Sequence, residues 1–270
     1  MSTGKPVNIV SPLGDDVLLF YRMDGHEELG RLFRYHVQCL SVDPELDGTQ
    51  ILGEGVTIVL DLVDGGQRYF NGVCTQFAQT GRVGRYVKYE MTLRPWFWLL
   101  TRTSDCTIYP DQAETNRMSI PEIVKAVFRK HDMSDFEESL NESYEEPREF
   151  CVQYRETDFN FASRLMEEEG IYYFFKHEEE RHVMVLADGP TSHEVIEGCE
   201  SVPFITADEN SLGRQEHIYE WNHALLYRAV SLPPAISISR CPPKIIWWKR
   251  KIPKNTPTLN SKCSTIPAFS

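Results

Sequence analysis

This sequence of 270 residues has no long apolar run, no Cys-x-x-Cys pair and no basic leader segment. Without about 18 consecutive apolar residues, no membrane-spanning helix and no stable membrane insertion are expected. The seven cysteines are widely spaced, which argues against a zinc site and a disulfide framework. No signal peptide is recognisable at the N-terminus, so we expect synthesis in the cytoplasm.

The charge balance is strongly acidic, with 40 Asp and Glu against 28 Lys and Arg and a formal net charge of -12. Nucleic-acid binding over the whole surface needs clustered Lys and Arg, so we expect no nucleic-acid partner. At 41% hydrophobic residues the chain can form a substantial core and is not a disordered chain.

Motifs for catalysis are also missing. The sequence has no Gly-x-Ser-x-Gly elbow and no phosphate-binding loop ending in Gly-Lys-Ser or Gly-Lys-Thr. The acidic triplet Glu167–Glu169 has no visible partner, and His177 and His182 lack the short spacing of paired metal ligands. We therefore expect no catalytic residue, no cofactor-binding residue and no metal site, and predict that the chain is not an enzyme.

Residues 1–110 have the alternating pattern of β-strands. A short apolar run, Val17–Tyr21, is followed by Asp24–Gly25, which predicts a turn. Strands this short and closely spaced favour an antiparallel β-barrel. The other strands are expected over 32–40, 55–62, 68–77 and 85–94.

Residues 111–212 change to a mixed pattern. Ser119 and Glu122 form a capping-box pattern before apolar residues at helical spacing, which predicts a helix near 119–131. A second helix is expected near 158–169, with Gly170 at its end, followed by a hairpin over 171–186. The fold class predicted is therefore α+β, mainly β: an antiparallel barrel, then an α/β module and an irregular C-terminal tail.

The tail, residues 229–270, differs from everything before it. It holds seven Lys and Arg and seven of the 16 prolines, but no Asp, Glu or Gly. Prolines at this density block regular elements, so the tail is expected to be disordered. The basic run Trp247–Lys251 lies among these prolines without periodicity; nucleic-acid or membrane binding by it is the weaker interpretation.

Six blocks of sequence carry a family resemblance: Arg31–Tyr35, Gly72–Val73, Leu93–Leu100, Ser119–Ile123, Cys151–Phe161 and Arg164–Phe175. In this order and spacing, they resemble the N-terminal part of VgrG proteins, the spike tips of type VI secretion systems in the Vgr and Rhs-associated family. The resemblance covers residues 10–228, and 213–228 would then begin a second, incomplete barrel.

The resemblance implies a structural function. Members of this family resemble the hub of contractile phage tails: they form a homotrimer, cap the hexameric tube of Hcp protein, bind effector or adaptor proteins and leave the cell without a signal peptide. A contractile-phage tail or baseplate hub is the alternative. Five aromatic residues are candidates for packing in the core or at such an interface: Trp96, Trp98, Tyr172, Tyr173 and Phe174.

The resemblance also suggests a change of reading frame after Arg228. If codons are reread from their third base, Ala235–Ser239 permits Asp-Phe-Asp-Phe and Lys262–Ser270 permits Phe-Asp-Tyr-Pro-Gly. Both resemble sequences of the second VgrG barrel, in that order. We therefore expect a truncated, frameshifted hub that does not form a stable trimer by itself, and a non-functional product is one expected outcome.

Overall fold

The computed structural model describes residues 6–62, 65–109, 117–144 and 148–193, together with Phe204 and Ile218. The chain divides into two units after Ser192, and every helix and strand named below lies in the first unit. The boundaries predicted at residues 110, 212 and 228 and the tail predicted over 229–270 lie outside the described residues.

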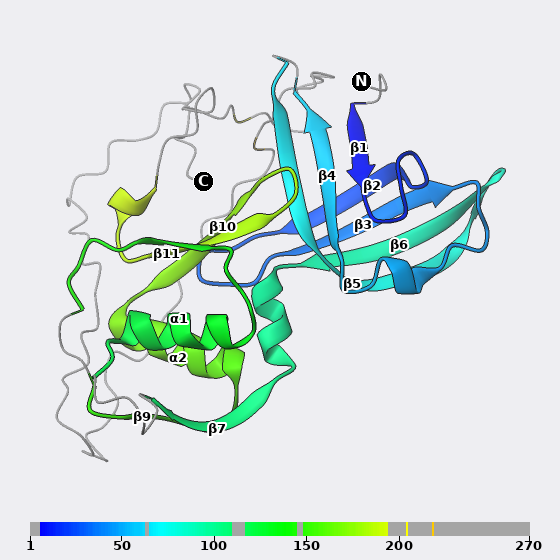
Figure 1. Cartoon of the computed structure of the whole chain (residues 1–270). Coiled ribbons are helices and arrows are strands. Elements are labelled where there is room, and N and C mark those ends of the chain that lie inside the picture. Colours follow the sequence, from blue (N-terminus) through cyan, green and yellow to red (C-terminus); the bar gives the residue numbers. More distant parts are fainter. Residues whose placement is uncertain are drawn as a thin grey trace, which may run out of the picture. The chain divides into compact units, whose positions relative to one another are not determined.

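A six-stranded antiparallel sheet takes up the first part of the chain (Figure 1). The strands are arranged in the order β1-β4-β5-β6-β3-β2. Their bounds are β1 Val7–Val10, β2 Leu19–His26, β3 Arg34–Ser41, β4 Gly55–Asp61, β5 Gln67–Val83 and β6 Tyr86–Arg94, with a short helix η1 (Gly48–Gln50) between β3 and β4.

Alternation along these strands puts apolar side chains on one face. On β3, Tyr35, Val37 and Cys39 are buried in a core shared with Met91 and Leu93 of β6. Register shifts in the β2–β3 and β5–β6 pairs increase the local twist, and the sheet curls around this core.

The barrel prediction holds at the level of a curled antiparallel sheet, a half-barrel. Among the described residues β1 and β2 are its two edges, and no hydrogen-bonded ladder joins them.

The turn predicted at Asp24–Gly25 is wrong. Both residues lie inside β2, where Asp24 pairs with His36 and Gly25 with Tyr35. A β-carbon on Gly25 would meet the Tyr35 ring at 3.1 Å, so the glycine lets two strands pass over a large buried side chain.

The second part of the first unit combines helices, a hairpin and a two-stranded ribbon. Helices α1 (Ile120–Lys130) and α2 (Asp158–Glu169) correspond to those predicted near 119–131 and 158–169, and β10 and β11 to the hairpin predicted over 171–186. Strand β8 joins β11 in parallel, and β7 pairs with β9. The remaining bounds are η2 Trp96–Thr101, β7 Ser104–Tyr109, β8 Phe136–Ser139, β9 Cys151–Thr157, β10 Tyr172–His177, β11 His182–Ala187 and η3 Pro190–Ser192.

The helix ends are set by local sequence. The Glu122 carboxylate accepts hydrogen bonds from the backbone N–H and the hydroxyl of Ser119, at 2.7 and 2.9 Å, which fixes the start of α1. Thr157 accepts the backbone N–H of Asn160 and caps α2, while Gly170 ends it at a φ of 73°. The two helices pack on each other and on η2 around a second core (Figure 1).

Candidate interaction surface

The five aromatic candidates divide by burial. Trp96, Tyr173 and Phe174 are 5%, 3% and 8% exposed, so within this chain they belong to cores. Tyr172 is half-buried, and its hydroxyl donates to the Gly189 carbonyl at 2.9 Å. Trp98 is also half-buried, on η2. Trp98 and Tyr172 are therefore the two candidates that reach the surface of the described chain.

Hydrogen bonds in the interior connect the β10–β11 hairpin to the curled sheet and to the start of η2. The backbone N–H of Trp96 donates to Nε2 of His182 at 2.8 Å, and Nδ1 of His182 lies 2.7 Å from the Asn71 amide oxygen. The Asn71 amide nitrogen donates to the Thr57 hydroxyl, which donates to the Glu179 carbonyl at 2.7 Å. Because Nε2 accepts, Nδ1 is the protonated nitrogen of this histidine.

His177 is half-buried beside His182, with their ring centres 6.2 Å apart. Its Nε2 lies 2.9 Å from the Tyr35 hydroxyl, which donates to the Glu27 carboxylate at 2.8 Å. Its Nδ1 contacts the backbone of Asn71. Burial lowers the pKa of His177, and burial together with His177 lowers the pKa of His182 to about 3, so both rings are neutral at pH 7.

Other polar groups considered for chemistry are engaged in surface ion pairs. Glu168 lies 2.6 Å from Arg148 and 3.4 Å from Arg164, and Glu169 lies 3.7 Å from Arg148. The described residues contain no group of three or more His, Cys, Asp or Glu that could hold a metal ion. Cys39, Cys74 and Cys151 are buried free thiols.

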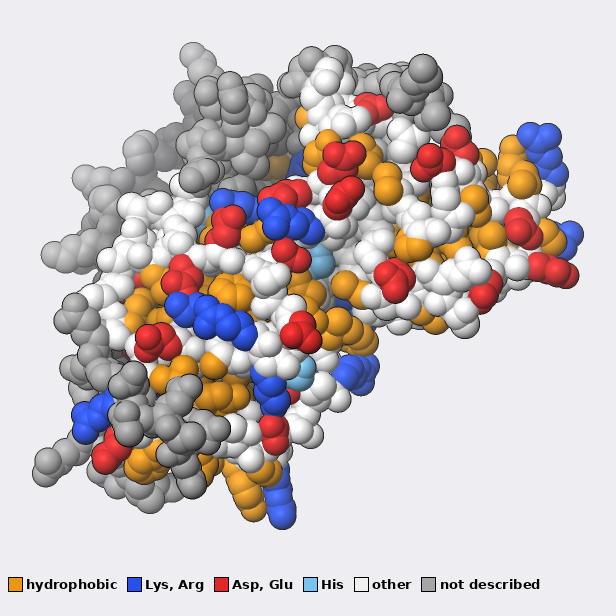
Figure 2. Space-filling model, viewed as in Figure 1, with side chains coloured by type: hydrophobic (Ala, Val, Ile, Leu, Met, Phe, Trp, Pro, Cys, Tyr) orange, Lys and Arg blue, Asp and Glu red, His pale blue; other side chains and the backbone are white. Residues whose placement is uncertain are grey.

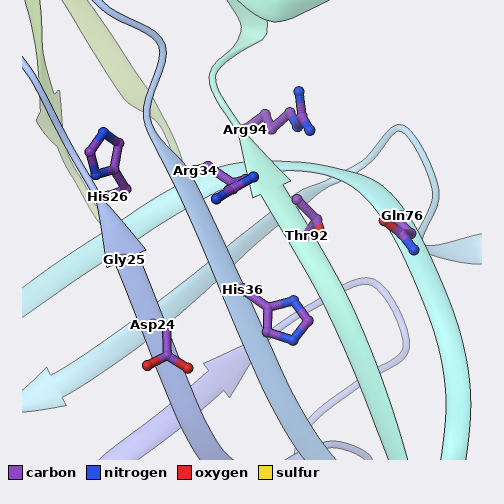
Figure 3. A pocket seen from close by; sticks show the side chains of 8 residues that line it. All are labelled: Asp24, Gly25, His26, Arg34, His36, Gln76, Thr92 and Arg94. Atoms are coloured by element: carbon purple, nitrogen blue, oxygen red, sulfur yellow. The ribbon is translucent and has the colours of Figure 1, made fainter.

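A shallow pocket of about 430 Å³ lies on the outer face of the curled sheet (Figure 3). One row of side chains crosses four strands there: Asp24 lies opposite His36, His36 opposite Thr92, and Thr92 opposite Gln76. The full lining is Asp24, Gly25, His26, Arg34, His36, Gln76, Thr92 and Arg94.

Two arginines occupy the next row. Tyr35 pairs with Leu93 in the antiparallel β3–β6 ladder, so Arg34 lies opposite Arg94. Figure 3 shows both side chains projecting from these neighbouring strands. Among the described residues no carboxylate is within salt-bridge distance of either guanidinium. Like charges directly opposite each other destabilise a sheet, so this pair carries an uncompensated repulsion.

The cationic surface continues onto Trp98. The guanidinium carbons of Arg94 and Arg102 lie 4.8 and 4.7 Å from the centre of its ring system. Nε of Arg94 is buried and has no hydrogen-bond acceptor in the described part of the chain. Burial, then the charges of Arg34 and Arg102, lower the pKa of Arg94. We call Arg34, Arg94 and Arg102, with Trp98, the arginine cluster.

The carboxylates nearest the pocket are already paired. Asp24 makes two contacts with Arg22, at 2.9 and 3.0 Å. Glu90 lies 3.0 Å from Lys88 and 3.7 Å from His36. The arginine cluster is thus a local excess of positive charge on a chain of net charge -12, and Figure 2 shows acidic side chains spread over the face it depicts.

The fold is that of a phage tail hub. One similar solved structure is that of the E. coli c3393 protein, described as a type VI secretion component with structural similarity to the T4 tail proteins gp27 and gp5. The match covers 70% of this chain and 50% of the c3393 chain, with a TM-score of 0.58 and 28% sequence identity. The model of the phage tail baseplate hub (GPD) family matches residues 26–233. The chain belongs to the phage tail baseplate hub (GPD) family.

Curated relatives narrow this class. The chain is 46% identical over 226 residues to the type VI secretion system spike protein VgrG1a of Pseudomonas aeruginosa, covering 83% of this chain and 34% of the relative. It is 46% identical over 220 residues to VgrG1c of the same organism, covering 81% of this chain and 29% of the relative. The predicted resemblance to VgrG proteins is confirmed, and the chain spans about a third of the length of these relatives.

No helix in the described part of the chain is long and apolar enough to cross a membrane.

The arginine cluster was not predicted from the sequence. The sequence pattern that could have pointed to it is the alternation along β6, which puts Thr92 and Arg94 on the polar face of the sheet. The position of Arg34 opposite Arg94 depends on the long-range β3–β6 pairing, which alternation alone does not specify.

Proposed function

We propose that this chain is a structural hub component of a type VI secretion spike. In an assembled spike it caps the Hcp tube as part of a homotrimer, aids effector delivery and leaves the cell through the secretion machine. The observation that carries this proposal is the 46% identity over 226 residues to VgrG1a, supported by the hub fold of the curled sheet.

Packing surfaces perform such a function, so the proposal needs no catalytic group and treats the chain as a non-enzyme. Residues 1–110 would form the first hub barrel, 111–212 the α/β module and 213–228 the start of a second barrel. Trp98 and Tyr172 would serve at interfaces, while Trp96, Tyr173 and Phe174 support them from within the cores.

A chimaera tests this function. Residues 1–228 replace the matching part of VgrG1a in a strain lacking the native gene, and secretion of Hcp is measured. We expect secretion close to that of the strain with intact VgrG1a, because the hub surfaces are exchanged like for like. A chimaera that is folded and abundant but supports no Hcp secretion contradicts the proposal.

A contractile-phage tail hub is the alternative, and the family match to a phage baseplate hub favours it. The 46% identity to type VI spike proteins favours the secretion spike more strongly. Genes for type VI sheath and tube proteins beside the coding gene would support the spike, whereas phage tail genes in that position would support the alternative.

We further propose that the chain leaves the family reading frame after Arg228. The change of composition at residue 229 supports this, as does the end of the family match at residue 233. The coding DNA decides the matter: the alternative frame after codon 228 is expected to read on as a second barrel. An alternative frame with no such sequence rules the proposal out.

A further inference from the structure

We propose that the arginine cluster binds a carboxylate-rich segment of a partner polypeptide. The inference deepens the proposed function, because it states the chemistry of one partner that the hub binds, and it rests on that function. Arg34 and Arg94 would hold the carboxylates, and Arg102 and Trp98 would extend the site along η2.

The first argument is the repulsion inside the cluster. Arg34 lies opposite Arg94 on adjacent strands, and the charges of Arg34 and Arg102 both act on Arg94. Two like charges in a cross-strand pair oppose folding unless an anion lies between them. A bound carboxylate between two guanidiniums would convert this repulsion into two charge-assisted contacts.

The second argument is the hydrogen-bonding capacity of the cluster. An arginine side chain and an indole have donors and no acceptor. Nε of Arg94 is buried and has no acceptor in the described part of the chain. A buried donor without a partner costs free energy, and a carboxylate oxygen of a bound segment would remove that cost by accepting from this donor.

The third argument concerns which anion fits. A nucleic-acid backbone needs basic residues spaced along a track, whereas only two arginines, Arg34 and Arg94, line this pocket, together with the carboxylate of Asp24. A net charge of -12 also repels a long polyanion. A short segment with a few carboxylates meets only the local positive field, and its planar carboxylates match the guanidinium fork.

Fluorescence anisotropy tests the proposal on the full chain. The probe is a fluorescein-labelled hexaglutamate peptide, with hexaglutamine as the neutral control and a short oligothymidylate as the nucleic-acid control. We expect saturable binding of hexaglutamate that weakens with salt, and weaker binding of both controls. Arg34→Gln and Arg94→Gln should each weaken binding by about tenfold, the loss of one charge-assisted contact.

Arg85→Gln is the matched control, because Arg85 also stacks on an aromatic ring, that of Tyr86, but does not line the pocket. It should leave hexaglutamate binding unchanged. Circular dichroism checks that Arg94→Gln is folded, and Arg34→Gln, which removes no contact with Trp98, repeats the test if it is not.

Three results overturn the proposal: no hexaglutamate binding, equal losses in Arg34→Gln and Arg85→Gln, or tighter binding of oligothymidylate. Failure of the hub function is distinguishable from these, because the chimaera measures Hcp secretion without reference to the peptide. If the chimaera supports Hcp secretion while the full chain binds no hexaglutamate, the proposed hub function is supported and the proposed acidic partner is contradicted.

Discussion

The backbone N–H of Trp96 donates a 2.8 Å hydrogen bond to Nε2 of His182, although the two residues are 86 positions apart in the chain. The bond joins the start of η2 to β11, and Asn71 continues the connection to β5. Buried polar networks of this kind stabilise a fold only when every member has its partner. The attachment of the β10–β11 hairpin to the curled sheet therefore depends on a few side chains.

Asn71→Ala should lower the free energy of unfolding by about 2–4 kcal/mol, because it leaves Nδ1 of His182 unpartnered and Thr57 without a donor. Chemical denaturation measures the loss. Asn160→Ala is the control, since Asn160 is exposed on α2 and only its backbone makes the capping bond. Equal stabilities of the two variants would mean that the network contributes nothing.

Acid should weaken the fold through His182. Its pKa is about 3 in the folded chain and about 6.5 when unfolded, so the unfolded state binds more protons between these values. The stabilisation is complete above pH 6.5 and is lost as the pH falls. Between pH 7 and pH 4.5 we expect a loss of about 2–3 kcal/mol from this residue.

His182→Gln separates this loss from that of the carboxylates, because glutamine does not titrate. Denaturation of both chains at pH 7 and pH 4.5 should show a smaller acid loss in the variant. If the two chains lose the same free energy, His182 is not a neutral buried histidine.

Gly72→Ala should destabilise the sheet. A β-carbon there would lie 3.0 Å from the Leu93 β-carbon and 3.2 Å from the Arg94 carbonyl oxygen, next to the Val73–Arg94 end of the β5–β6 pair. Overpacking of this kind costs about 1–3 kcal/mol. Gly55→Ala has open space around its β-carbon and should be near neutral. Thermal unfolding compares the two variants, and equal midpoints would contradict the close approach.

Trp96 and Trp98 should respond differently to truncation. Trp96→Ala removes a buried ring packed against Phe97 and Phe128 and should cost about 3–5 kcal/mol of unfolding free energy. Trp98→Ala removes a half-buried ring under two guanidiniums and should cost about 1 kcal/mol. Chemical denaturation measures both. A larger cost for Trp98 would place it in a core.

Sequence patterns predict the helices well, because the ends of a helix are set by residues close to it in the chain. The Ser119–Glu122 capping pair and the Gly170 stop give α1 and α2 nearly to the residue. The Asp24–Gly25 prediction failed because a turn sequence was accommodated inside a strand by packing against Tyr35. That contact comes from tertiary structure, and no local pattern contains it.

The site residues show the same division. His177 and His182 are visible in the sequence, but their hydrogen bonds to Asn71 join strands that are distant in the chain. Arg34 and Arg94 become neighbours only when β3 pairs with β6. Register between distant strands depends on the whole core, so the charge cluster could not be derived from spacing.

We have proposed that this chain is a spike hub protomer, and we expect its trimer to need the sequence of the alternative frame after Arg228. Multi-angle light scattering on two products tests it most directly: the chain as printed, and the chain with that frame restored in its coding DNA. We expect a monodisperse trimer for the restored product and no stable trimer for the printed chain. A monodisperse trimer of the printed chain, or a restored product that is folded and monomeric, would contradict it.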